Sequence, residues 1–364
     1  MALILTFLGK GGTGRTTIAI AAARALASQG KRVLLAGQDS GPAFALLLGA
    51  AASPDPQEIE SNLQVVQFQS TVLLESNWQQ LKKLEEQYAR TPFFKEVFGQ
   101  ELAVLPGMDG VLALNAIREY DVEGRYDAIV YDGPAGCELL RLLGIPEILS
   151  WYVRRFRELW LKSDVGKAVS PLLQPIVNAT LTVNWGGEPV GKSTDQINDR
   201  LEKGKQVMSD PNRVLAYLVA TSDPAAIATA RYLWGSAQQV GITVPGLLLN
   251  QTVVSDAIAS DFSPLSLHPL PAKDGEDWKP LIDALPDFTQ ATQAPKPIEI
   301  DIAGRQIRLF LPGFDKKQVK LTQYGPEITI EAGDQRRNIL LPAQLSGKSV
   351  TGAKFQNSYL MISL

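Results

Sequence analysis

Residues that bind metals or form disulfides are almost missing from this sequence of 364 residues, which has one cysteine, Cys137, and one histidine, His268. A disulfide framework therefore cannot form within one chain, and neither can a zinc site built from cysteine and histidine. We expect no zinc and a reducing, cytoplasmic compartment. The one disulfide still open to the chain would join two copies of Cys137 across a symmetric dimer.

The sequence also lacks a strong positive charge and long hydrophobic runs. Its net charge is −3, so no global basic field points to nucleic acid as a partner. The apolar runs fall short of the roughly 18 residues that span a bilayer, and we expect no secretory signal. With 45% hydrophobic and 20% charged residues, the composition predicts a globular protein without stable membrane insertion.

An alternation of short apolar runs and helical patterns fills the first three quarters of the chain. Residues 2–8 form a continuous apolar run, typical of a buried parallel strand, and an alanine-rich helical stretch over 16–28 follows it. This alternation predicts an α/β fold with a doubly wound, mostly parallel sheet and ligands at the carboxyl ends of its strands. Further strands are predicted at 31–36, 126–132, 213–220 and 244–249, with helices at about 73–90 and 224–240.

The pattern changes near residue 285. Prolines in a polar stretch predict a linker over 286–297, and apolar residues then recur at every second position, as in Ile298, Ile300 and Ile302. Turns containing glycine separate these short strands, so residues 298–364 are predicted to form a small all-β sandwich. The larger domain then covers residues 1–285, with helical insertions at about 60–105 and 147–212.

The segment between the first strand and the first helix carries the strongest chemical signal. Residues 8–17 read Leu-Gly-Lys-Gly-Gly-Thr-Gly-Arg-Thr-Thr, the frame of a phosphate-binding loop. Its glycines let backbone N–H groups face an anion, and the following helix adds its dipole. We expect Thr16 to ligate Mg²⁺ directly beside the phosphates of ATP. The predicted nucleotide-binding residues of the loop are Gly9, Lys10, Gly11, Gly12, Thr13, Gly14, Arg15, Thr16 and Thr17.

Arg15 stands where this motif ordinarily has lysine. A lysine ammonium is compact and follows the γ-phosphate, whereas a guanidinium is wider, planar and bidentate. We therefore expect nucleotide binding to persist and hydrolysis of ATP to ADP and phosphate to be slow.

Because of Lys10, the loop resembles the deviant Walker A box of the arsenical-pump and tail-anchored-protein-targeting ATPase family, and the resemblance extends through most of the first 290 residues. It implies a homodimer in which Lys10 reaches the phosphates of the partner and takes part in catalysis. It also implies that Asp39 orients the attacking water, that Asp132 holds Mg²⁺ through water, and that Asn250 recognises adenine.

Each of these three residues has a simpler interpretation. Asp39 could cap a helix, Asp132 could be an ordinary loop acid, and Asn250 could close a turn. The sequence also departs from the family pattern, because no proline, alanine and histidine follow Asp39. The family's zinc-binding Cys-x-x-Cys and arsenite-binding cysteines are missing as well, so arsenite transport is not expected.

Residues 151–160 place apolar side chains on one helical face and charged ones opposite. In the resembling family this region builds a hydrophobic groove for a transmembrane helix of a client protein. The alternative is that the face packs into the domain's own core or against a dimer partner. The candidate client-binding residues are Tyr152, Phe156, Leu159 and Trp160.

The C-terminal segment resembles an α-crystallin (small heat-shock) domain, beginning with the stretch Leu309–Leu321 and ending with Val350–Leu364. Such domains bind non-native chains without ATP. The alternative is a structural appendage that braces the ATPase domain.

Together these features predict a homodimeric, ATP-binding and slowly hydrolysing chaperone or targeting factor for hydrophobic client segments. The alternative is a nucleotide-stabilised scaffold or holdase without turnover. A partition or cofactor-assembly ATPase fits less well, because the expected metal-cluster cysteines are missing.

Overall fold

The computed structural model describes residues 1–88, 97–162, 194–290 and 293–364, and its largest element is an eight-stranded sheet. The strand order is β3-β4-β2-β5-β1-β6-β7-β8, and every neighbouring pair is parallel except β3 and β4. The strands span Leu3–Leu8 (β1), Val33–Gly37 (β2), Gln57–Glu60 (β3), Leu63–Gln67 (β4), Ala128–Asp132 (β5), Val214–Ala220 (β6), Gly246–Asn250 (β7) and Ser266–Leu270 (β8).

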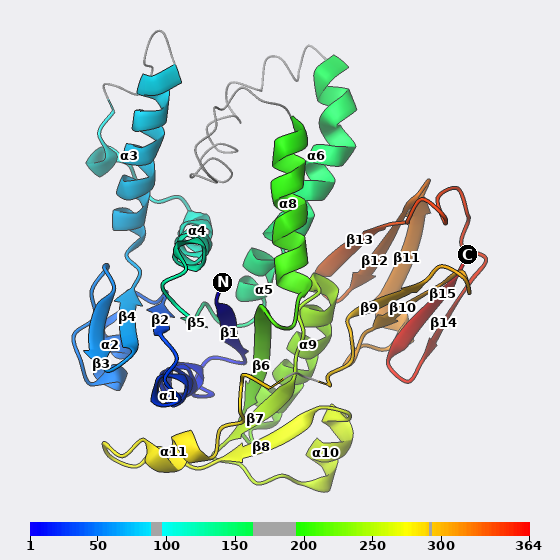
Figure 1. Cartoon of the computed structure of the whole chain (residues 1–364). Helices are drawn as coiled ribbons and strands as arrows, with labels where there is room; N and C mark the ends of the chain where they lie inside the picture. The colour runs from blue at the N-terminus through cyan, green and yellow to red at the C-terminus, as the bar shows by residue number, and fades with distance from the viewer. Residues whose placement is uncertain (89–96, 163–193, 291–292) are drawn as a thin grey trace.

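Helices cover both faces of this sheet (Figure 1). On one face lie α4, α5, α9 and α10, and on the other lie α1, α2 and α11. Helices α3, α6 and α8 project away from the sheet at the top of Figure 1. The helices span Arg15–Ser28 (α1), Pro42–Leu48 (α2), Ser70–Tyr88 (α3), Met108–Glu123 (α4), Cys137–Leu143 (α5), Ile145–Lys162 (α6), Thr194–Ser209 (α8), Pro224–Val240 (α9), Asp256–Phe262 (α10) and Lys279–Asp283 (α11).

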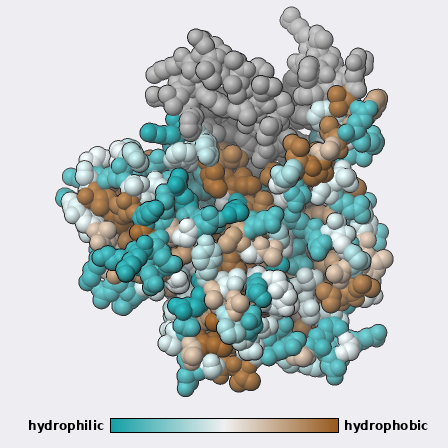
Figure 2. All heavy atoms as spheres, turned by 180° about the vertical axis from the view of Figure 1, so that it is seen from behind, coloured by the Kyte–Doolittle hydropathy of each residue, from teal (hydrophilic) through white to brown (hydrophobic). Residues whose placement is uncertain are grey.

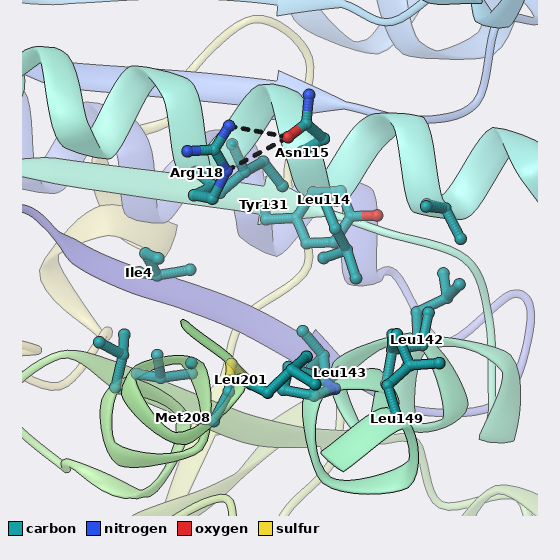
Figure 3. Close-up of a pocket in the computed structure, with 17 residues that line it drawn as sticks. Ile4, Leu114, Asn115, Arg118, Tyr131, Leu142, Leu143, Leu149, Leu201 and Met208 are labelled. Carbon is teal, nitrogen blue, oxygen red and sulfur yellow. Dashed lines mark hydrogen bonds between the residues drawn. The ribbon is translucent and has the colours of Figure 1, made fainter. Parts of the chain in front are cut away.

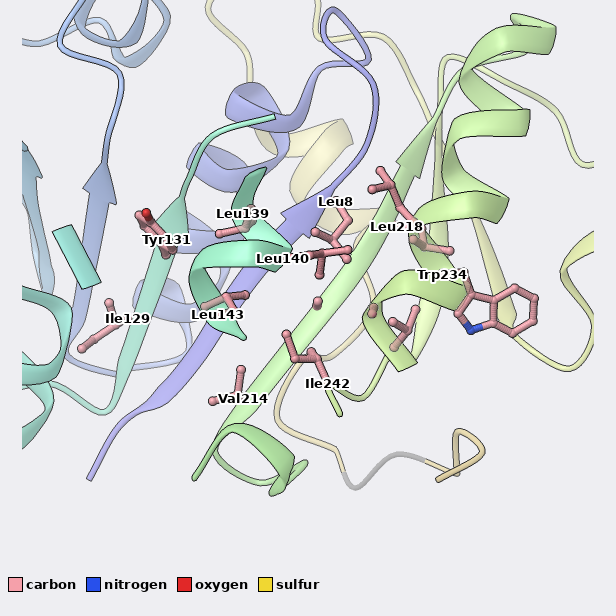
Figure 4. Close-up of a cluster of buried hydrophobic side chains, with 14 of the residues drawn as sticks. Leu8, Ile129, Tyr131, Leu139, Leu140, Leu143, Val214, Leu218, Trp234 and Ile242 are labelled. Atoms are coloured by element: carbon pink, nitrogen blue, oxygen red, sulfur yellow. The ribbon is translucent and has the colours of Figure 1, made fainter. Parts of the chain in front are cut away.

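The core follows from the sequence pattern of the strands. The central strands are apolar at nearly every position, as expected for a sheet that is covered on both faces, and β2, β5 and β6 are buried along their whole length. Figure 4 shows one of the two resulting clusters, where Leu139, Leu140 and Leu143 of α5 meet Leu8 and Leu218 of the sheet. The alanines of α1 let that helix pack closely on the opposite face.

The C-terminal domain is a sandwich of two antiparallel sheets. One sheet has the order β14-β15-β10-β9 and the other β11-β12-β13. The alternating isoleucines point inward, so Ile307, Ile328, Ile330 and Ile362 are fully buried between the sheets. The strands span Ile298–Asp301 (β9), Gln306–Phe310 (β10), Val319–Tyr324 (β11), Glu327–Ala332 (β12), Gln335–Leu340 (β13), Gly352–Gln356 (β14) and Tyr359–Ser363 (β15).

The fold class predicted from the sequence is thus confirmed: a mostly parallel α/β sheet followed by an all-β domain. Two local features differ from the expectations. Strand β4 lies inside the stretch expected to be a helical insertion at about 60–105, yet it pairs with β2 in the main sheet. Phe288 lies in the predicted linker and is 2% exposed, with its ring against Phe7 of β1 and Tyr217 of β6. Among the described residues, none of the helices is long and apolar enough to span a membrane.

Candidate nucleotide site

The phosphate loop joins β1 to α1, and two of its glycines are required by close contacts. A Cβ atom on Gly9 would lie 2.4 Å from the carbonyl oxygen of Val219 on the neighbouring strand β6. Gly14 has a left-handed φ of +91° and faces the amide of Asn250, which would lie 2.3 Å from an added Cβ. The loop can therefore hold its backbone close to both neighbours only with glycine at these positions.

Asn250 ends β7 and binds the phosphate loop directly. Its Nδ2 donates a hydrogen bond to the carbonyl oxygen of Thr13 at 3.0 Å. The sequence resemblance predicts adenine recognition for this residue; in the structure its amide binds the phosphate loop.

A buried carboxylate lies beside the start of α1. Asp132 is the last residue of β5 and is 7% exposed, and it shares a hydrogen bond with Thr16. Burial raises the pKa of this carboxyl, while the Thr16 hydrogen bond and the charge of Arg15 oppose the rise. The pair of a hydroxyl and a carboxylate at a helix N-terminus offers the oxygen ligands that Mg²⁺ prefers, so these residues fit the cation.

The guanidinium of Arg15 binds backbone carbonyls. One guanidinium nitrogen, Nη1, donates to the carbonyl oxygens of Gly133 and Pro134 at 3.2 and 3.1 Å, just beyond the end of β5. Burial lowers the pKa of Arg15, and its Nε is buried without a partner among the described residues. The arginine thus ties the first turn of α1 to the loop that follows Asp132.

Lys10 forms an ion pair within its own chain. Its Nζ lies 3.3 Å from Oδ2 of Asp223, and both side chains are about half exposed. Asp223 is also the N-cap of α9, where it accepts from the backbone N–H groups of Ala225 and Ala226. An exposed pair of this kind contributes little to stability, so Lys10 can leave it at little cost.

Asp39 lies in an exposed loop that a buried side chain holds in place. Its carboxylate accepts from the backbone N–H of Gly41 at 2.8 Å. Gln67, the last residue of β4, donates both amide hydrogens into this loop, to the carbonyl oxygens of Asp39 at 2.7 Å and of Gly41 at 2.8 Å. Gln67 is 9% exposed, so the clamp is largely shielded from water.

The residue before Asp39 is tied to β5. The hydroxyl of Tyr131 donates a hydrogen bond to the side-chain oxygen of Gln38, and the Gln38 backbone N–H donates to the Asp132 carbonyl oxygen at 3.0 Å. The Gln38 amide also reaches Asp109 of α4, at 3.5 Å. Sequence reasoning found neither Gln67 nor Tyr131; the only available signal was that each lies at the carboxyl end of a strand.

An apolar cavity of about 190 Å³ lies on the face of the sheet that carries α4, between that helix and α5, α6 and α8 (Figure 3). Leu142, Leu143 and Leu149 close it on one side, and Leu201 and Met208 of α8 on another. The ring of Tyr131 belongs to its wall. The cavity therefore touches the residue that holds Gln38, one position before Asp39.

The candidate client-binding residues lie on α6. Tyr152 is 51% exposed, and Ile148, one turn earlier, is 42% exposed. The side chains of Phe156, Leu159 and Trp160 lie outside the described part of the chain. In Figure 2, brown apolar side chains border the grey atoms at the top of the molecule.

Comparison with known proteins agrees with this geometry. The family model described as "Anion-transporting ATPase" matches residues 2–266. The chain belongs to this family. A second model, described as "HSP20-like domain found in ArsA", matches residues 303–364 and so confirms the resemblance of the sandwich to a small heat-shock domain.

Some relatives align with this chain over nearly its whole length. A Prosthecochloris vibrioformis protein named "Putative arsenical pump-driving ATPase" is 28% identical over 396 residues, covering 99% of this chain and 95% of the relative. A protein of the same name from Chlorobaculum tepidum is 26% identical, with the same coverage. "ATPase GET3" of Malassezia globosa is 26% identical over 209 residues, which cover 56% of each chain.

Asp132→Asn is expected to stabilise the nucleotide-free protein at neutral pH. Because burial raises the pKa of Asp132, the folded state binds a proton more tightly than the unfolded state. The wild type therefore loses stability as pH rises from the ordinary value of 3.8 through the raised pKa. The melting temperature of the variant should exceed that of the wild type by a margin that grows with pH and vanishes in acid.

Asp127→Asn is the matched control, because its pKa is lowered to about 2 by Arg32. Its carboxylate stabilises the fold above the ordinary value of 3.8 and loses that effect as pH falls toward 2. The two variants should thus show opposite pH trends in thermal melts. Equal melting temperatures of Asp132→Asn and wild type at neutral pH would contradict the first prediction.

Proposed function

We propose that this chain binds ATP with Mg²⁺ and hydrolyses it slowly. The observation that carries the proposal is that three features lie at one edge of the sheet, where adjacent parallel strands have their carboxyl ends. These features are the phosphate loop, the buried Asp132 with its Thr16 hydrogen bond, and the Asp39 loop that Gln67 holds. Membership of the ATPase family supports the same activity.

The proposed role of each site residue follows from its chemistry. Backbone N–H groups of the glycine loop and the N-terminus of α1 bind phosphate oxygens. Thr16 would hold Mg²⁺ directly and Asp132 would hold it through water, and the bound cation neutralises charge that develops on the phosphates. Asp39 would orient the attacking water, and Gln67 holds the backbone carbonyls of Asp39 and Gly41.

Arg15 gives the physical reason for slow turnover. Its Nη1 is held by the carbonyl oxygens of Gly133 and Pro134, which anchors the guanidinium at the loop after β5. A lysine ammonium is compact and would follow the γ-phosphate more closely. We infer that Arg15 favours the resting arrangement of the loop after β5.

ATP turnover by the purified full chain tests the proposal. Asp39→Asn should lower kcat by about 100-fold, since removal of one positioned catalytic group typically costs that much, while nucleotide affinity stays close to that of the wild type. Arg15→Lys should raise kcat. Gln67→Ala should lower kcat with little change in nucleotide affinity, because Gln67 acts on the Asp39 loop alone.

Gln64→Ala is a control for the Gln67 variant, since Gln64 lies on the same strand and accepts from Tyr126 instead. Tight nucleotide binding with no turnover in any variant would overturn the hydrolysis proposal. It would favour the second candidate, a scaffold or holdase stabilised by nucleotide, which the Arg15 contacts to backbone also support.

We further propose a homodimer that closes on ATP, in which Lys10 leaves Asp223 and reaches the phosphates of the partner. The weak, exposed pair with Asp223 allows this exchange. Lys10→Ala should abolish the ATP-dependent compaction that small-angle scattering detects in the wild type, with Lys31→Ala, at the far end of α1, as the control. Unchanged compaction in Lys10→Ala would exclude the role in the partner's site.

A hydrophobic client segment is the proposed cargo. The resemblance to the tail-anchored-protein-targeting ATPases implies this cargo. The apolar cavity between α4, α5, α6 and α8, together with the exposed Ile148 and Tyr152 on α6, supplies apolar surface for it. Filling of the cavity would act on Tyr131 and so on the Gln38–Asp39 segment. Client binding and turnover would then be coupled.

Capture of a 20-residue apolar helix fused to a carrier protein tests the cargo. Ile148→Asp and Tyr152→Asp should each weaken its binding by roughly tenfold or more, because even a neutral polar group left unpaired in an apolar contact costs about 1–3 kcal/mol and a carboxylate costs more. Val122→Asp on α4 is the matched control, as Val122 is exposed to a similar or greater degree. Equal capture by all three variants would rule out this face of α6.

A further inference from the structure

One hairpin, β12–β13, makes a set of polar contacts between the sandwich and the ATPase domain, beside the aromatic contact of Phe310 with Trp234 on α9. Ile328, Ile330 and Ala332 of β12 point into the core of the sandwich. Because side chains alternate along a strand, Glu327 and Glu331 lie on the outer face. That face and the turn of the hairpin contact three helices of the ATPase domain.

The turn of the hairpin is fixed against α5 and α9. Asp334 forms an ion pair with Arg141 of α5, and its backbone N–H donates to the hydroxyl of Tyr232 on α9 at 2.8 Å. Gly333 has a φ of +58°, and a Cβ on it would lie 2.7 Å from the Tyr232 hydroxyl. The turn therefore sits as close to α9 as glycine allows.

The opposite end of β12 is fixed against α6. Glu327 accepts from Trp151 Nε1 at 3.1 Å and from Arg154 at 2.7 Å. The Glu327 side chain is 14% exposed and that of Arg154 31%. Because both partners are largely withdrawn from water, this charge-assisted contact holds α6 more firmly than an exposed pair would.

The return strand binds the end of α9. Arg337 donates to the carbonyl oxygen of Gln238 at 2.9 Å, in the last turn of that helix, and burial lowers its pKa. A cation at a helix C-terminus is favoured by the helix dipole. The hairpin thus contacts α5, α6 and α9 through three separate polar side chains.

Helix α5 connects this hairpin to the nucleotide site. It begins at Cys137, directly after the loop whose carbonyls, at Gly133 and Pro134, accept from Arg15. Arg141 lies one turn into the helix and binds Asp334. Movement of the loop that starts α5 reaches the turn of the hairpin through this pair, whose side chains are 61% and 58% exposed.

We propose that the β12–β13 hairpin is a brace that transmits the nucleotide state from α5 to α6. The six residues of β12 span about 17 Å between its two contacts, and the strand is hydrogen-bonded on both sides, so it moves as one piece. This rests on the proposed function in one respect: ATP must bind at the phosphate loop. The sandwich then acts as an internal regulator of the apolar face on α6.

A fluorescent reporter on α6 tests the brace in the full chain. The parent carries Cys137→Ser and Tyr152→Cys labelled with bimane, whose emission responds to its surroundings, and Mg²⁺-ATP is added. Asp334→Arg, which repels Arg141, should reduce the ATP-induced change in emission roughly threefold or more. Adding Arg141→Asp to it restores opposite charges and should restore the change.

Glu331→Arg is the matched control, because Glu331 lies on the same strand but pairs with Arg336 inside the hairpin. It should leave the reporter unchanged. Glu327→Gln provides a second disrupting variant at the other end, since it keeps an acceptor for Trp151 and loses the charge that binds Arg154. It should reduce the response as Asp334→Arg does.

Binding of a fluorescent ATP analogue, measured in parallel, distinguishes a failure of the proposed function from a failure of the brace. If the parent binds no nucleotide, the proposed function is wrong and the brace has no state to transmit. If ATP binds but the parent reporter is silent, or Asp334→Arg and Glu327→Gln respond as fully as the parent, the brace is overturned. Loss in both variants with recovery in the charge-swapped pair supports it.

Discussion

The parallel pairing of β1 with β5 and β6 is the constraint on which the rest of the structure depends. In this register Leu8 leads into the phosphate loop at the same edge where β5 ends in Asp132 and where β6 leads to Asp223. Strands β2 and β7 add Asp39 and Asn250 to that edge. Side chains distant in sequence therefore meet because the strands run in one direction, and one-residue slips would remove the site as well as the core.

A second consequence is that the loop after β5 binds part of Arg15. The backbone carbonyls of Gly133 and Pro134 both accept from Nη1, whereas Nε is buried without a partner among the described residues. Burial disfavours a charged group without acceptors, so the backbone compensates the buried guanidinium only in part. The substitution of arginine for lysine thus changes the resting structure of the site, besides its catalytic power.

Much of this could be predicted from the sequence, for reasons that are local. The apolar run before the phosphate loop and the glycine positions specify strand, loop and helix without help from the rest of the chain, and the period-two isoleucines specify the sandwich. Gln67 could not be predicted in the same way. Its importance depends on β4 pairing with β2, which brings its amide to Asp39, and the short, mixed sequence of β4 resembles the irregular segment around it.

The ion pair of Lys10 shows a different limit. The sequence marks this lysine by its neighbours in the loop, but its partner Asp223 becomes visible only when the ends of β1 and β6 are placed side by side. Similarly, Arg154 belongs to a charged helical face that the sequence pattern assigns to solvent, yet it binds Glu327 of the sandwich. Amphipathic patterns locate an apolar face well and leave open which polar residues find partners in another domain.

The two domains share a continuous core, and this core limits how the C-terminal domain can move relative to the ATPase domain. Phe310 of β10 lies against Trp234 of α9 and against Tyr359 of β15, and a Cβ on Gly235 would lie 2.2 Å from the carbonyl of Pro312. Separation of the sandwich would expose these aromatic rings to water at a cost of several kcal/mol. A domain joined in this way follows the motion of α9, whereas a freely tethered domain would leave the helices of the ATPase domain independent of it.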